Sequence, residues 1–297
     1  MSHSLRFLGG MNPVLPWDEQ LRCYKHLEAL DFDLAGVADH FVHWTGAQTP
    51  WLEGWTLLAA LAAQTSRIRL ASWVTQIPLR NPGMLARQAL TVDHISHGRL
   101  ELGLGIGLTT DPSIAMLGLP NWSYPERVAR FKEYVEIVDR LLSNEITTYT
   151  GKFYRIEAAR MDPRPVQRPR PPIIIAANGP VMLKRAAELA DNWNTISYAA
   201  TLDGQLAEMR QRMRAIDAHC AAIGRDPGSL RRSYLMLDAV RYYGSTQLFG
   251  DTMRRFIDLG VSEIGIGYPR DAAQLAIFEE IAREVIPRLK EEFAAPQ

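Results

Sequence analysis

The sequence predicts an α/β protein of the (β/α)₈ TIM-barrel class, with an insertion between the fourth helix and the fifth strand. Short apolar runs alternate along the chain with longer segments of helical periodicity, as in repeated βα units. Eight such units can be counted, whereas an open doubly wound sheet usually has about six strands. Runs such as Ile173–Ala177 are apolar throughout, which is typical of parallel strands covered on both faces.

Eight short runs are the predicted strands of this barrel. In chain order they are Leu5–Leu8, Leu34–Ala38, Ile68–Val74, Leu100–Gly105, Ile173–Ala177, Trp193–Ile196, Ser233–Val240 and Glu263–Gly267. The intervening helices are expected to begin near Pro16, Trp51, Pro82, Tyr124, Pro180, Leu202, Ser245 and Asp271. Pro82 and Pro180 suit a first helical turn because the φ angle of proline is already helical. Asp18, Ser245 and Asp271 can cap a helix or complement its dipole.

One segment interrupts the alternation of strands and helices. Residues 147–172 contain a short hairpin sequence, followed by a proline-rich stretch that favours extended backbone. The alternation resumes immediately afterwards, so this segment is an insertion and not a linker between domains. A barrel of roughly 250 residues with insertions fits the length of the chain, and we expect one domain over residues 1–297.

Composition excludes several classes of protein. Lysine plus arginine and aspartate plus glutamate number 33 each, so no net positive charge favours nucleic acid or a membrane surface. The first residues lack a charged segment followed by an apolar run, and no segment reaches the roughly 18 apolar residues of a membrane span. We therefore expect a cytoplasmic protein. Cys23 and Cys220 lie in helical patterns without metal-ligand spacing, so neither a disulfide framework nor a metal site is predicted.

Unusual residues follow four of the predicted strands, at the barrel rim where active sites of this fold lie. Asp39, His40 and Trp44 come directly after the second strand. The third strand runs into a polar turn with two prolines, and the fourth ends in glycines that permit close approach of a ligand to the backbone. The fifth leads through Asn178-Gly179 into a helix whose free N–H groups suit a phosphate. Together these strand ends predict a cofactor site.

The glycine-rich fourth strand also carries a family resemblance. Residues 90–107, which include VDHISHGRLELGLGIG, resemble a signature of the bacterial luciferase-like flavin monooxygenases and their deazaflavin-dependent relatives. Further matches occur in the order of that family over roughly residues 5–270. They are ADHF at 38–41, RNP at 80–82, ERVARFKEYVEIVDRLL at 126–142, YTGKFY at 149–154 and AANGP at 176–180.

The resemblance implies where a flavin or deazaflavin would bind. In such proteins the ring system lies in the barrel mouth, against a bulge with a non-prolyl cis peptide, and the phosphate lies near the loop after the fifth strand. The bulge corresponds to Ser72-Trp73-Val74, with Trp73-Val74 as the cis bond. The residues expected to bind the cofactor are Asp39, Ser72, Trp73, Val74, Gln76, Gly105, Ile106, Gly107, Ala176, Ala177, Asn178 and Gly179.

The form of the motif after the second strand favours coenzyme F-420 over FMN. ADHF with Trp44 four residues beyond His40 resembles the deazaflavin branch. The expected activity is hydride transfer between F-420 and a small, fairly apolar organic substrate. His40 is the expected acid or base, because an imidazole titrates near neutral pH. Asp39 would orient the cofactor or the imidazole, and Trp44 would wall the substrate side.

Two other functions are compatible with the same residues. The first is an FMN-dependent monooxygenase that takes reduced flavin from a partner reductase and uses O₂. The second is a non-catalytic flavin-binding relative. The family resemblance also implies a homodimer. Leu108 stands where the sugar-phosphate dehydrogenases of the F-420 branch have an acidic residue, and Ser197-Tyr198 lacks a nearby lysine. We therefore do not expect glucose 6-phosphate as the substrate.

Overall fold

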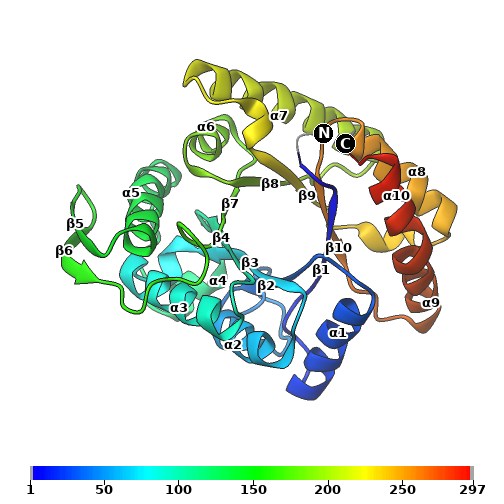
Figure 1. Ribbon diagram of the computed structural model, residues 1–297, viewed down its shortest axis with the longest axis horizontal. Coiled ribbons are helices and arrows are strands. Elements are labelled where there is room, and N and C mark those ends of the chain that lie inside the picture. Colours follow the sequence, from blue (N-terminus) through cyan, green and yellow to red (C-terminus); the bar gives the residue numbers. More distant parts are fainter. Residues whose placement is uncertain (1–2, 295–297) are drawn as a thin grey trace. The chain divides into compact units, whose positions relative to one another are not determined.

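Eight parallel strands form a closed barrel in a computed structural model that describes residues 3–294 (Figure 1). The strand order is β1-β10-β9-β8-β7-β4-β3-β2. The barrel strands are β1 (Arg6–Met11), β2 (Leu34–Asp39), β3 (Arg69–Gln76), β4 (Leu100–Gly105), β7 (Ile173–Ala176), β8 (Asn192–Ile196), β9 (Arg231–Leu235) and β10 (Glu263–Gly267). The predicted (β/α)₈ class is therefore confirmed.

Helices follow the strands at the positions that the sequence indicates. They are α1 (Trp17–Ala29), α2 (Gly54–Gln64), α3 (Pro82–Ile95), α4 (Pro112–Met116), α5 (Tyr124–Ser143), α6 (Pro180–Leu189), α7 (Leu202–Ala222), α8 (Thr246–Ile257), α9 (Ala272–Glu280) and α10 (Ile286–Glu292). The Ser245 side chain accepts from the N–H of Leu248, and Asp271 accepts from Gln274. Both predicted caps are confirmed. Within residues 3–294, no helix combines the length and apolar character needed to span a membrane.

Three predicted boundaries differ from the structure by three residues or more. Strand β1, expected to end at Leu8, runs to Met11. The helix expected near Trp51 begins at Gly54, because the Glu53 carboxylate accepts from two free N–H groups of its first turn. The strand expected to reach Val240 ends at Leu235, the last residue of β9 paired with a neighbour. The chain then turns into a short 3₁₀ helix, Ala239–Tyr242. An apolar run can therefore continue past the end of the strand that it contains.

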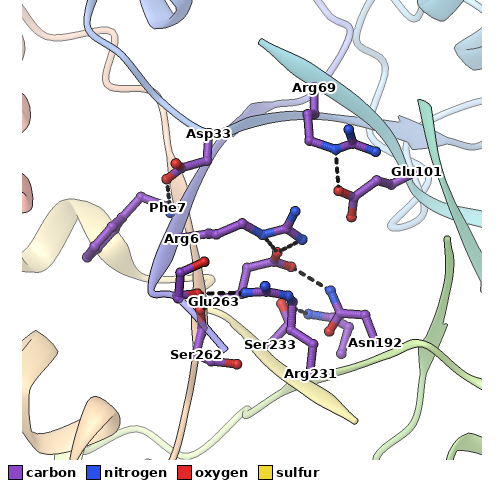
Figure 2. Close-up of polar contacts among 12 residues, drawn as sticks. Arg6, Phe7, Asp33, Arg69, Glu101, Asn192, Arg231, Ser233, Ser262 and Glu263 are labelled. Atoms are coloured by element: carbon purple, nitrogen blue, oxygen red, sulfur yellow. Dashed lines mark hydrogen bonds and ion pairs between the residues drawn. The ribbon is translucent and has the colours of Figure 1, made fainter. Parts of the chain in front are cut away.

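The chain packs as two compact units, and each is described by itself. In the first unit, which contains β1, β8, β9 and β10, a buried carboxylate joins three strands (Figure 2). Glu263 of β10 accepts from Arg6 of β1 at 2.8 Å and from Asn192 of β8 at 2.8 Å. The Glu263 side chain is fully buried, so these partners compensate the cost of removing its charge from water.

In the second unit, which contains β3, β4, β7 and most of β2, a bulge shifts the register of β3 against β4 between Ala71 and Thr75. Gly103 makes room for this bulge. A Cβ atom on Gly103 would lie 1.9 Å from the carbonyl oxygen of Ser72. The Ser72 hydroxyl instead bonds both backbone groups of Gly103, at 2.9 and 3.0 Å. Nearer the strand end, Gly105 likewise admits the Val74 side chain.

The predicted hairpin of the insertion is confirmed, and helix α5 holds its tip. Strands β5 (Ile146–Thr150) and β6 (Arg155–Arg160) pair antiparallel. The Glu133 carboxylate of α5 accepts from the N–H groups of Lys152, Phe153 and Tyr154, at 2.9 to 3.2 Å. The three N–H groups lie in the turn between the strands, and the charged Glu133 carboxylate provides their hydrogen-bond acceptor.

Asp93 and Arg99, two residues of the family signature, stabilise the fold through hydrogen bonds to the backbone. Asp93 is fully buried and accepts from the backbone of Val166 and Gln167, at 2.7 and 3.1 Å, which holds the proline-rich stretch. Arg99 donates to backbone carbonyl groups at the end of α2 and before β3, including that of Ile68 at 2.7 Å. Both charged side chains therefore hydrogen-bond buried backbone groups of the fold.

We predict that Gly103→Ala destabilises the protein by about 3 kcal/mol or more, because the new methyl group meets backbone that cannot rotate away. Gly267→Ala is the matched control, since a Cβ atom on this strand glycine meets nothing within 4 Å. Its effect should stay below about 1 kcal/mol. Equilibrium unfolding in urea measures both changes. Equal midpoints for the two variants would contradict the assigned role of Gly103.

Candidate active site

Two polar side chains of the second unit, those of Gln76 and Asp111, meet at His40. His40 follows β2, Gln76 ends β3, and Asp111 lies in the loop after β4. The Nδ1 atom of His40 is 2.6 Å from Oδ2 of Asp111 and 2.7 Å from Nε2 of Gln76. Gln76 Nε2 also donates to the same carboxylate oxygen at 2.9 Å. The structure thus pairs the predicted histidine with a carboxylate 71 residues away in the sequence.

The Asp111 carboxylate is held in its charged form. Its side chain is fully buried, and burial alone would raise its pKa. Hydrogen bonds from His40, Ser113 and Gln76 outweigh that effect and hold the pKa of Asp111 well below its ordinary value. One of them comes from the backbone N–H of Ser113 at 2.8 Å, because Asp111 caps helix α4. The carboxylate therefore stays ionised throughout the neutral range.

Asp39 has a different partner from the one expected. Its carboxylate accepts from Arg80 Nε at 3.1 Å, and Arg80 also binds Glu53 at 2.6 Å. Burial opposes the charge on Arg80, but these two carboxylates raise the pKa of the guanidinium. The hypothesis that Asp39 orients the imidazole is wrong, because the Asp39 carboxylate is paired with the Arg80 guanidinium. Asp111 lies beside the Nδ1 atom of His40 instead. The predicted contact between Asp39 and a cofactor stays a prediction.

Aromatic rings surround the imidazole of His40. Its ring centroid lies 5.4 Å from that of Trp44 and 5.8 Å from that of Trp51. His43 stacks on Trp44 with centroids 4.1 Å apart. The indole N–H of Trp51 is buried and has no hydrogen-bond partner. The imidazole is consequently bordered on these sides by rings, and only 16% of its side chain is exposed.

The bulge of β3 has the features that the resemblance implies. The peptide bond Trp73-Val74 is cis. Ser72 is bonded to Gly103, as described above, and the Val74 side chain lies over Gly105. The indole N–H of Trp73 is buried without a partner. This segment therefore combines a fixed backbone with an unused donor.

The loop after β4 is fixed by a buried arginine that the sequence analysis missed. Arg127 of α5 is fully buried and donates to the carbonyl groups of Ile106 and Trp122, at 3.0 and 2.9 Å. Gly107 has a φ angle of +74°, which glycine adopts without strain. A Cβ atom there would lie 2.6 Å from Oε1 of Gln76. That oxygen is buried and lacks a hydrogen-bond partner.

The remaining predicted cofactor residues lie around the end of β7. Ala176 is the last residue of that strand. In the first unit, the backbone of Ala177 bonds Asn194 at 2.9 Å, and the Asn178 side chain accepts from Thr195 at 2.8 Å. Gly179 precedes α6 and has no side chain to cap it, so the first N–H groups of this helix keep no side-chain acceptor.

These residues fit a flavin-type ring system. The indole N–H groups of Trp51 and Trp73 are unused donors, and Oε1 of Gln76 is an unused acceptor. A pyrimidinedione ring offers carbonyl oxygens to the former and an N–H group to the latter. In contrast, residues 3–294 contain no cluster of three or more His, Cys, Asp or Glu side chains suited to a metal ion. The two indole donors and the amide acceptor suit an organic cofactor.

Asp111 carried a sequence signal that the analysis did not use. Asp111-Pro112-Ser113 is a helix start, with a capping residue followed by proline in the first turn. The loop after the fourth strand was already expected at the active rim, so an acidic cap in it was a candidate site residue. Arg127 had no such signal, because it falls inside a long amphipathic helix.

We predict that Arg80→Met destabilises the protein by about 3–5 kcal/mol, because it leaves the buried Asp39 carboxylate unpaired. Combining it with Asp39→Asn should restore part of this loss. Thermal unfolding followed by circular dichroism measures both. Arg155→Met is the control, since its ion pair with Glu157 is mostly exposed and contributes little. An Arg80→Met variant as stable as that control would refute the pairing.

Comparison with known proteins agrees with this architecture. An uncharacterised protein of Mycobacterium tuberculosis is 31% identical over 230 residues, which cover 77% of this chain and 74% of the relative. An F-420-dependent glucose-6-phosphate dehydrogenase of Segniliparus rotundus is 30% identical over 205 residues, covering 67% of this chain and 58% of the relative.

Among solved structures, an F-420-dependent secondary alcohol dehydrogenase in complex with an F-420–acetone adduct superposes with a TM-score of 0.81 at 17% identity. The superposition covers 96% of this chain and 100% of the other, and it shows a shared fold. The model of the luciferase-like monooxygenase family matches residues 4–242, well over half of the sequence. The chain therefore belongs to the luciferase-like monooxygenase family of oxidoreductases.

Proposed function

We propose that this protein transfers a hydride between coenzyme F-420 and a small, fairly apolar organic substrate. The observation that carries the proposal is the position of His40, bonded to the Asp111 carboxylate and bordered by Trp44 and Trp51. A buried imidazole beside two indoles provides an acid or base in surroundings that favour an apolar substrate. The F-420-dependent relative that covers two thirds of this chain supports the choice of cofactor.

Bound F-420 would supply a carbon centre, C5 of the deazaflavin, that accepts or returns a hydride. The bulge at Ser72-Trp73-Val74 and the glycines of β4 would hold the ring system, because they offer fixed backbone and little side-chain bulk. In the first unit, the start of α6 after Asn178 and Gly179 has no side-chain cap from Gly179, and such a helix start suits a phosphate.

His40 would handle the proton that accompanies hydride transfer. When an alcohol is oxidised, the imidazole accepts the hydroxyl proton, and when a carbonyl or activated alkene is reduced, it returns a proton. Trp44 and Trp51 would exclude water from their side of the His40 imidazole, and an apolar substrate would pack against the two indole rings. The partner of this reaction is therefore a small molecule, and a reductase that recycles the cofactor would complete it.

The proposed substrate differs from glucose 6-phosphate. Leu108, which replaces the acidic residue of the sugar-phosphate dehydrogenases, is an apolar side chain 42% exposed after β4. Tyr198 is also exposed, without a lysine adjacent in sequence. The phosphate of a phosphorylated sugar requires a cationic partner, which Leu108 and Tyr198 do not offer. Neutral secondary alcohols, ketones and enones are the substrates that we would screen.

The first test is a titration of the purified apoprotein with oxidised F-420 and, separately, with FMN, followed by quenching of cofactor fluorescence. We expect F-420 to bind with a Kd in the micromolar range or below, and FMN to bind at least about tenfold more weakly, a difference of about 1.4 kcal/mol. Preference for FMN would overturn the F-420 proposal and point to oxygen-dependent chemistry. Tight binding of F-420 without turnover of any donor or acceptor would indicate a non-catalytic protein.

We predict that His40→Ala lowers kcat by roughly 10²–10⁴-fold, the usual contribution of a positioned acid or base. The Kd for F-420 should stay within about threefold, because the imidazole acts on the substrate proton. Stopped-flow absorbance of F-420 with the best substrate of the screen measures the rate. His219→Ala on the outer helix α7 is the control for removal of a histidine. Full turnover by His40→Ala would exclude His40 from the mechanism.

A further inference from the structure

We infer that Asp111 is a positioning residue that keeps the proton of neutral His40 on Nδ1 and leaves Nε2 to exchange the proton with the substrate. This inference rests on the proposed function, whose acid or base is His40. It concerns a residue outside the family motifs, in the loop after β4.

The contact between the two side chains determines the tautomer. Oδ2 of Asp111 lies 2.6 Å from Nδ1 of His40, and an ionised carboxylate can only accept a hydrogen bond. Nε2 of Gln76 is also 2.7 Å from Nδ1, and an amide N–H could donate there only to an unprotonated nitrogen. The same Nε2 donates to Oδ2 of Asp111 at 2.9 Å. Because hydrogen bonds to an ionised acceptor are the stronger ones, the carboxylate favours two converging N–H groups, and Nδ1 carries the proton. Since a neutral imidazole has a single N–H, its Nε2 atom retains a free lone pair.

The carboxylate is itself held from three directions. Oδ1 of Asp111 accepts from the backbone N–H of Ser113 at 2.8 Å, as the cap of α4. The Ser113 hydroxyl accepts from the backbone N–H of Phe41 at 3.3 Å. Phe41 directly follows His40, so the start of α4 is tied to the segment that carries the imidazole. The pair is thus held by contacts within the protein.

This arrangement assigns the proton transfer to one atom. During oxidation of an alcohol, Nε2 of His40 would accept the hydroxyl proton as the O–H bond breaks. Bound F-420 would supply the acceptor for the hydride that leaves the alcohol carbon, so that the alcohol becomes a carbonyl compound. The imidazolium that forms is stabilised by the neighbouring Asp111 carboxylate, which remains ionised. Reduction of a carbonyl compound follows the same path in reverse.

The test reads the tautomer directly in the cofactor-free protein. Chemical shifts of ¹⁵N-labelled histidine rings at pH 8.5 distinguish a protonated from an unprotonated ring nitrogen, and His40→Ala assigns the signals. We expect wild-type His40 to show a protonated Nδ1 and an unprotonated Nε2. In Asp111→Asn, we expect loss of that preference and a signal from the Nε2–H tautomer. Glu53→Gln is the matched control, because Glu53 binds Arg80 and makes no contact with His40.

Activity gives the second measurement. Asp111→Asn should lower kcat by roughly 10²–10⁴-fold, as removal of the carboxylate partner of a catalytic histidine does, while the Kd for F-420 changes by less than about threefold. A wild-type His40 with its proton on Nε2, or an Asp111→Asn spectrum identical to wild type, would overturn the inference, and the first outcome needs no variant. Failure of F-420 to bind would instead overturn the proposed function and leave the tautomer result standing.

Discussion

The close approach of the Ser72 carbonyl to the bare backbone of Gly103 is the constraint on which the candidate site depends. It permits the bulge in β3, and the bulge shifts the register so that Gln76, at the strand end, lies opposite Gly105. From there the Gln76 amide reaches both His40 and Asp111. A side chain at position 103 would therefore disturb not only strand packing but also the polar contacts at the barrel rim.

Two buried aspartates of the second unit show how the partner of a charge decides its role. Asp39 is paired with Arg80, whose charge is permanent, and the pair holds neighbouring loops through Glu53. Asp111 is paired with His40, whose imidazole can accept and return a proton. The ion pair with Arg80 compensates the free energy of burying the Asp39 carboxylate when the protein folds. Asp111 can in addition stabilise a charge that appears on His40 only during the reaction.

Local signals made the fold predictable, whereas the central contact of the site is non-local. Proline at the start of α3 and the side-chain caps of α8 and α9 act over one turn, so the sequence places them correctly. The end of β9 depends on where its neighbours stop pairing, which an apolar run does not encode. Likewise, Asp39 is adjacent to His40 in the sequence, but its carboxylate is hydrogen-bonded to Arg80. The strand order β4-β3-β2 places the loops after β2 and β4 near each other, and Asp111 contacts His40 instead.

The residues of the family signature stabilise the fold, whereas other residues lie near the reacting atoms. The signature therefore identifies the fold better than the substrate. Asp93 and Arg99, which carry much of the resemblance, bond buried backbone groups and so hold helices and loops to the barrel. Such contacts do not involve the substrate. The side chains near the reacting atoms belong to the loops after β2 and β4, where Trp44, Leu108 and Asp111 occur. Substitutions in those two loops can change the reaction without loosening the signature contacts, so relatives that share Asp93 and Arg99 need not share a substrate.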